Sequence, residues 1–199
     1  MQTVTALYGS YAAATQAISE LEAAGVAQDA ISVVSGSREN LAAADEDGDS
    51  DMEGAATGAS LGAVVAGGAG LLAGLGIMAI PGIGPVVAAG WLASTAAGAA
   101  VGGVAGGLLG SLADVGVSSD HAQVYAEGVR RGGSLVTVRA QDDQVLKVRE
   151  ILQRHGQIDP DECGLDYRAE GWAGFDEKAM PPSPAARNAD LLGRMGPTI

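Results

Sequence analysis

Residues 118–140, SSDHAQVYAEGVRRGGSLVTVRA, carry a helix signal, a turn signal and a strand signal in direct succession. The side chains at 118–120 can cap a helix that runs to Arg131. The glycine pair at 132–133 then turns the chain. The alternating SLVTVRA at 134–140 predicts a strand. This stretch therefore predicts a helix that reverses at once into a strand.

The N-terminal residues predict a strand, a helix and a second strand. TVTALY at 3–8 alternates as a strand does. Ser10 can cap the helix that follows, and Gly25 can end it. AISVVS at 30–35 predicts the second strand.

A similar unit closes the chain after residue 140. Asp142 or Asp143 can cap a helix that stops at Gly156. The GQIDP that begins at Gly156 is compatible with a short last strand. Together, residues 1–36 and 118–162 predict an α+β fold of the ferredoxin-like, split βαβ type. We expect its helices on one face of the sheet and a partly open second face.

The residues between the second and third strands have a different composition. No charged residue occurs from position 54 to position 113. PGIGP, from Pro81 to Pro85, divides this stretch into arms at 54–80 and 86–113. As a helix, each arm is long enough to cross a hydrocarbon core of about 30 Å.

Small residues recur every fourth position in both arms, which places them on one face of a helix. Such a face packs closely against another helix backbone, as small-xxx-small pairs do in membranes. We therefore predict a glycine-zipper helical hairpin over 54–117, inserted between strands two and three. Its turn residues are Pro81, Gly82, Gly84 and Pro85, and its helix-packing residues are Gly54, Gly58, Gly62, Gly70, Gly74, Gly90, Gly98, Gly102, Gly106 and Gly110.

Two environments suit this hairpin. A long stretch without charge is typical of membrane segments, so a lipid membrane is one expected partner. Arg38, Arg130 and Arg131 flank the stretch, and the positive-inside rule then places both termini in the cytoplasm. The alternative is a soluble cytoplasmic module whose hairpin is buried against partner copies. Both predict a homo-oligomer.

The remaining sequence carries no motif for catalysis, a cofactor or a metal. The net charge of −13 argues against nucleic-acid binding. The acidic residues at 45–53 belong to a solvated linker, 37–53, and lack the EF-hand glycine. The group His155, Asp159, Asp161, Glu162 and Cys163 does not match a zinc-ligand spacing. We expect a protein that is not an enzyme and has no cofactor.

Residues 163–199 contain spaced aromatics, a PPSP segment and a Leu-Leu pair. This composition predicts a disordered tail. Aromatic and leucine side chains in such a tail are also compatible with a peptide that docks on a protein partner.

Three segments resemble the bacterial general stress protein family of the YflT type. They are AIPGIGPVVAAG at 79–90, YAEGVRRGGSLVTVRA at 125–140 and ILQRHG at 151–156, and the resemblance covers residues 3 to about 162. It implies a role in stress tolerance and transfers no active site. The resulting hypothesis is a non-enzymatic, membrane-associated stress-response protein that acts by self-association.

Overall fold

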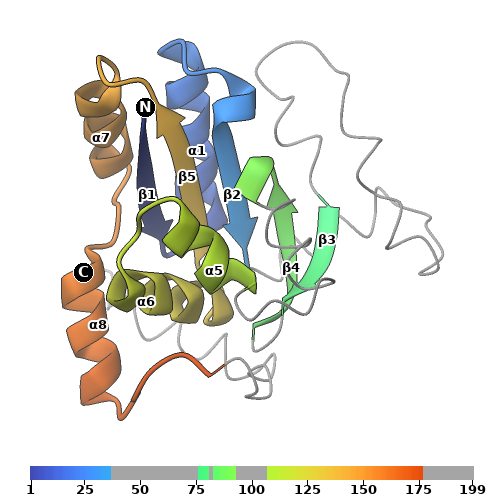
Figure 1. Cartoon of the computed structure of the whole chain (residues 1–199), viewed down its shortest axis with the longest axis vertical. Coiled ribbons are helices and arrows are strands. Elements are labelled where there is room, and N and C mark those ends of the chain that lie inside the picture. The colour runs from blue at the N-terminus through green and yellow to red at the C-terminus, as the bar shows by residue number, and fades with distance from the viewer. Residues whose placement is uncertain (37–75, 81–82, 93–106, 177–199) are drawn as a thin grey trace, which may run out of the picture.

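The computed structural model describes residues 1–36, 76–80, 83–92 and 107–176 (Figure 1). The expected linker at 37–53 and the tail from 177 lie outside these residues. Many of the predicted hairpin residues lie outside them too, namely Gly54, Gly58, Gly62, Gly70, Gly74, Pro81, Gly82, Gly98, Gly102 and Gly106.

The described strands form one antiparallel sheet in the order β1-β5-β2-β4-β3 (Figure 1). Because β1 and β2 each pair antiparallel with β5, they run parallel to each other. Helix α1 connects them. The strands are β1 (Gln2–Tyr8), β2 (Ile31–Ser35), β3 (Gly76–Ile80), β4 (Gly84–Ala89) and β5 (Ser134–Ala140).

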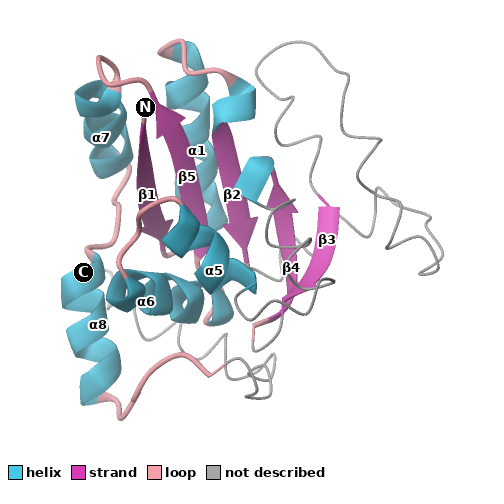
Figure 2. Cartoon of the chain, viewed as in Figure 1, coloured by secondary structure: helices cyan, strands magenta, loops and turns pink. Residues whose placement is uncertain are grey.

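Helices lie on both faces of the sheet (Figure 2). On the first face, α1 and α7 pack against Val4, Ala6 and Tyr8 of β1. On the second face, α5, α6 and α8 share a core with Leu7, Val34 and other strand residues. The helices are α1 (Tyr11–Ala23), η1 (Gln28–Ala30, a 3-10 turn), α5 (Gly107–Asp114), α6 (Ser119–Arg130), α7 (Val145–Arg154) and α8 (Pro160–Ala169).

The local signals around β1 and β5 are confirmed. The Ser10 side chain accepts a hydrogen bond from the Ala13 N–H at the start of α1. Ser118 does the same for His121 at the start of α6. Gly25 follows α1 with a φ of +90°, a conformation that suits a glycine beyond a helix end.

Two expectations after β5 need correction. The N-cap residue of α7 is Gln144 rather than Asp142 or Asp143, and its side chain makes no capping hydrogen bond. Asp142 instead forms an ion pair with the N-terminal amine of Met1, at 3.0 Å. The expected last strand is reduced to a single antiparallel bridge between Leu7 and Ile158.

The predicted helical hairpin is wrong at residues 76–80 and 84–89. Residues 76–80 and 84–89 are the paired strands β3 and β4, and β4 also pairs with β2. The expected reversal is present, and Gly84 and Pro85 lie on the strand that leaves it. The Ile83 N–H closes the reversal by donating to the Ile80 carbonyl, at 3.1 Å.

The reason is that β-branched residues cluster around PGIGP, at Ile77, Ile80, Val86 and Val87. Such residues favour strands. The edge of β2 also offers backbone hydrogen bonds that the glycine spacing does not reveal. The second arm is helical at α5, which contains Gly110. No helix in the described ranges is long and apolar enough to cross a bilayer.

The expected open second face is partly covered. Helices α5 and α6 lie in front of the lower part of the sheet in Figure 1. Their side chains bury Leu7, Val34 and Leu135, one from each of the three neighbouring strands β1, β2 and β5. The described helices therefore pack on both faces of the sheet rather than on one.

Candidate functional site

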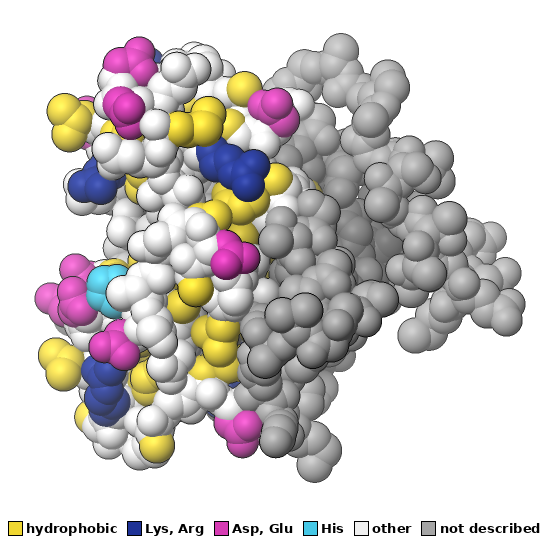
Figure 3. Space-filling model, in the orientation of Figure 1, with side chains coloured by type: hydrophobic (Ala, Val, Ile, Leu, Met, Phe, Trp, Pro, Cys, Tyr) yellow, Lys and Arg dark blue, Asp and Glu magenta, His cyan; other side chains and the backbone are white. Residues whose placement is uncertain are grey.

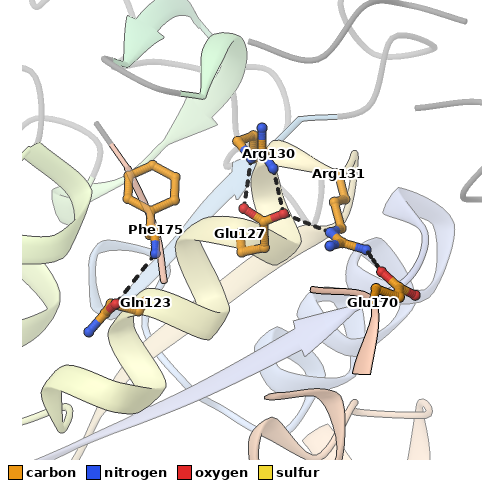
Figure 4. Close-up of polar contacts among 6 residues, drawn as sticks. All are labelled: Gln123, Glu127, Arg130, Arg131, Glu170 and Phe175. Atoms are coloured by element: carbon orange, nitrogen blue, oxygen red, sulfur yellow. Dashed lines mark hydrogen bonds and ion pairs between the residues drawn. The ribbon is translucent and has the colours of Figure 1, made fainter. Parts of the chain in front are cut away.

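Among the described residues, a dense group of charged contacts lies at the C-terminal end of α6 (Figure 4). The Glu127 side chain is 1% exposed there. Its carboxylate accepts two hydrogen bonds from Arg130 and one from Arg131, each at 2.7 Å. Spacings of three and four residues bring these side chains to the same face of the helix. Two guanidinium groups therefore share one buried carboxylate.

The charge states follow from these contacts. Burial alone would raise the pKa of Glu127, but the hydrogen bonds and charges of Arg130 and Arg131 outweigh it and lower that pKa. Burial would lower the pKa of Arg131, yet its bonds to Glu127 and Glu170 raise it. Glu127 and Arg131 therefore both stay ionised at neutral pH. The two arginines also lie where a helix dipole favours positive charge.

Arg131 extends the network to α8. It donates to Glu170 at 2.5 Å, as Figure 4 shows. Its guanidinium carbon also lies 4.0 Å from the centre of the Tyr167 ring. Tyr167 in turn meets Trp172 edge to face, with centroids 5.8 Å apart. Arg131 therefore fastens α8 and the following turn to α6 by charge and by stacking.

The glycines of this segment permit close packing. A Cβ on Gly128 would lie 2.5 Å from a methyl carbon of Leu7. A Cβ on Gly133 would lie 2.9 Å from the Gly128 carbonyl oxygen. The Gly133 carbonyl also accepts a hydrogen bond from the Gly36 N–H, at 3.1 Å. The EGVRRGGS segment thus touches the chain where it leaves β2 towards the uncharged stretch.

The tail begins later than predicted. Residues 163–169 belong to α8, which Asp159 caps by accepting from the N–H groups of Asp161 and Glu162. Beyond α8, Phe175 packs near the second core, and its N–H donates to the Gln123 side chain at 3.4 Å (Figure 4). The sequence DPDE carried this signal, because an N-cap aspartate followed by proline and acids is typical of a helix start.

The residues that were weighed as metal ligands have other contacts in the structure. The Nε2 atom of His155 lies 2.5 Å from a carboxylate oxygen of Glu20, and this contact joins the end of α7 to α1. Asp161 lies 3.0 Å from His121 and bridges α8 to α6. Cys163 is buried in the second core. Within the described ranges, His, Cys, Asp and Glu side chains form no group of three suited to a metal ion.

The network around Glu127 is suited to holding elements together. A carboxylate that is buried and bonded to two guanidinium groups is a poor proton acceptor, because protonation would break three charge-assisted hydrogen bonds. The role of Glu127 was not predicted from the sequence, where Arg130 and Arg131 entered only as positive charges that flank the uncharged stretch. The spacing of Glu127 to Arg130 and Arg131 was the available signal.

Comparisons of the chain with protein-family models, with characterised proteins and with solved structures gave no match.

Proposed function

We propose that this chain is a non-enzymatic bacterial stress-response protein that acts by self-association, with a ferredoxin-like body that carries the uncharged stretch. The strand arrangement supports this topology. Strand β5 lies between the parallel strands β1 and β2, and α1 and α7 cover the same face. The bridge at Ile158 stands beside β1, where a fourth strand of a split βαβ fold would pair.

The observation that carries self-association is the composition of β3. This strand, GIMAI at Gly76–Ile80, comes from the uncharged stretch and ends the described strand order. Strand β4 pairs with one of its sides, and no described strand pairs with the other. An edge strand without charge is a template for pairing with a second chain.

The network around Glu127 supports a structural role for the body. It joins α6 to α8 and lies beside Gly36, the last described residue before the segment 37–75. In this proposal the network holds a rigid platform from which the uncharged stretch departs. The role in stress tolerance comes from the family resemblance in three segments of the chain.

Sedimentation velocity of the full chain over a range of concentrations tests the proposal. We expect oligomers, and we expect Met78→Lys to shift them to lower mass, because a charge on an edge strand opposes edge pairing. Leu165→Lys is the matched control, since it adds the same charge at a side chain on α8 that is 65% exposed. A wild-type chain that stays monomeric, or equal effects of both variants, would contradict edge pairing.

Membrane association is the second candidate, favoured by the absence of charge from 54 to 113. In that case both termini lie in the cytoplasm, whereas the assembly proposal describes a soluble cytoplasmic protein. Flotation with vesicles of neutral lipid separates the two. Co-flotation supports a membrane partner, and oligomers that stay at the bottom of the gradient support a soluble assembly.

A further inference from the structure

A row of hydroxyl side chains crosses the second face of the sheet. Thr5 of β1 lies directly opposite Thr137 of β5. Thr137 lies directly opposite Ser32 of β2. Side chains opposite each other in neighbouring strands are close enough to share one ligand atom or group. We call Thr5, Thr137 and Ser32 the hydroxyl row.

Two members of the hydroxyl row have no hydrogen-bond partner among the residues that the structure describes. The Oγ1 atoms of Thr5 and Thr137 are both buried and unpaired, and Thr137 as a whole is 0% exposed. Ser32 differs, because its hydroxyl donates to the Ala89 carbonyl at 2.8 Å. Buried hydroxyls in native proteins are normally satisfied, and a pair left open side by side points to a group that is bound there.

An arginine stands beside this row. Arg139 follows Thr137 by two residues on β5, so its side chain leaves from the same face, and it lies opposite Thr3. Its guanidinium carbon lies 3.6 Å from the centre of the Trp91 ring. Stacking on an aromatic face leaves the N–H edge of a guanidinium available for an anion. Figure 3 shows basic atoms against hydrophobic atoms on the upper part of this face.

The surroundings keep Arg139 available. Trp91 is brought over the sheet by Gly90, whose φ is +89°, and its indole N–H donates to the Ala30 carbonyl at 3.3 Å. Arg130, Arg131 and Arg154 each form an ion pair with a glutamate. No such pair joins Arg139 to a carboxylate in the part of the chain that the structure describes.

We propose that Arg139, Thr5 and Thr137 form a binding site for the oxyanion of a small ligand, either a carboxylate or a phosphate group. The guanidinium of Arg139 donates charge-assisted hydrogen bonds to the oxyanion, and the two threonine hydroxyls donate to its other oxygens. Trp91 holds the guanidinium plane in place. This site is separate from the edge strand that carries self-association, so either proposal can fail without the other.

The experiment is a titration of the ¹⁵N-labelled full chain with sodium phosphate, sodium acetate and, at matched ionic strength, sodium chloride. We expect saturable shifts of the Trp91 indole N–H and the β5 amides with phosphate or acetate, and none with chloride. Saturation by one probe alone identifies that class of oxyanion. Absence of saturable shifts with both probes would overturn the proposal and leave the hydroxyl row with bound water.

Three variants identify the donors. Arg139→Gln should weaken binding about tenfold or more, the effect of losing a charge-assisted hydrogen bond. Thr137→Val should also weaken it without lowering the midpoint of thermal unfolding, because an unpaired buried hydroxyl does not stabilise the fold. Arg149→Gln, on the exposed side of α7, is the control and should leave binding unchanged. Equal binding by wild type and Arg139→Gln would contradict the assignment.

Discussion

At the scale of single residues, Glu127 is a buried carboxylate whose charge must be compensated by its neighbours. A buried carboxylate is costly unless charge and hydrogen bonds compensate, and here two arginines supply both. The arginines are themselves only 22% and 17% exposed. Removing the carboxylate charge would therefore leave two partly buried cations facing each other.

We predict that Glu127→Gln lowers the free energy of unfolding by about 3 kcal/mol at neutral pH, the usual effect of breaking a buried ion pair. Urea unfolding followed by circular dichroism measures this. Glu150→Gln is the control, because Glu150 pairs with Arg154 on an exposed surface and should change stability by less than about 1 kcal/mol. Equal effects of the two variants would mean that the buried network does not stabilise the fold.

The same variant also has a pH signature. Because the folded pKa of Glu127 is lowered from its ordinary value of 4.5, its ion pairs stabilise the fold above that pH. Their contribution is lost as the pH falls through the folded pKa. The difference between wild type and Glu127→Gln should therefore shrink below pH 4.5. A difference that does not depend on pH would show that packing, rather than charge, is lost.

At the scale of elements, Gly90 distinguishes the predicted helical hairpin from the strands that the structure shows. If Gly90 lay within a helix, as the glycine spacing predicts, replacing it by alanine would stabilise the fold by up to about 1 kcal/mol. In the structure its φ is +89°, and a Cβ would lie 2.4 Å from the Ile31 carbonyl oxygen. The helical prediction and the observed structure therefore give opposite signs for the effect of Gly90→Ala on the free energy of unfolding.

We expect Gly90→Ala to destabilise the fold by about 2 kcal/mol or more, from left-handed strain together with the clash against β2. Gly25→Ala isolates the strain, because Gly25 has a φ of +90° with nothing within 4 Å of its Cβ position. It should cost about 1 kcal/mol. Thermal unfolding of both variants measures the two losses of stability. A Gly90→Ala variant more stable than the wild type would instead support the predicted helix.

The outcome for the elements depended on how local their signals were. Strands β1, β2 and β5 and helices α1 and α6 follow from alternation and from caps such as Ser10 and Ser118, which act within a few residues. Strands β3 and β4 were missed because the pairing of β4 with β2, which joins them to the sheet, is a tertiary contact. A four-residue glycine spacing is compatible with a helix, but in an alanine-rich sequence the same spacing does not require one.

The candidate sites were less predictable than the fold. The contacts of Glu127 within α6 follow from spacing alone, but its burial depends on tertiary packing that spacing does not reveal. The hydroxyl row is invisible in sequence, because Thr5, Ser32 and Thr137 become neighbours only through strand register. Register is set by the hydrophobic pattern of whole strands, and one threonine does not reveal it.

At the scale of the whole molecule, the net charge of −13 opposes any contact between copies. If copies associate through the uncharged stretch, their contacts contribute no ionic attraction, while the bodies repel each other. Salt screens this repulsion over distances of about 10 Å at 0.1 M and less at higher concentration. We therefore predict that the average mass in sedimentation velocity rises as sodium chloride increases from about 0.05 M to about 0.5 M.

The direction of this salt effect separates two kinds of interface. Apolar contacts are not weakened by simple salt, so screening leaves only the gain from reduced repulsion. An interface built from exposed ion pairs, such as those of Arg154 with its glutamates, would instead weaken as salt rises. Met78→Lys provides the internal check, since it should reduce the mass at every salt concentration if β3 forms the contact. Dissociation of the wild-type chain by salt would place the interface on its charged surfaces and exclude the edge strand.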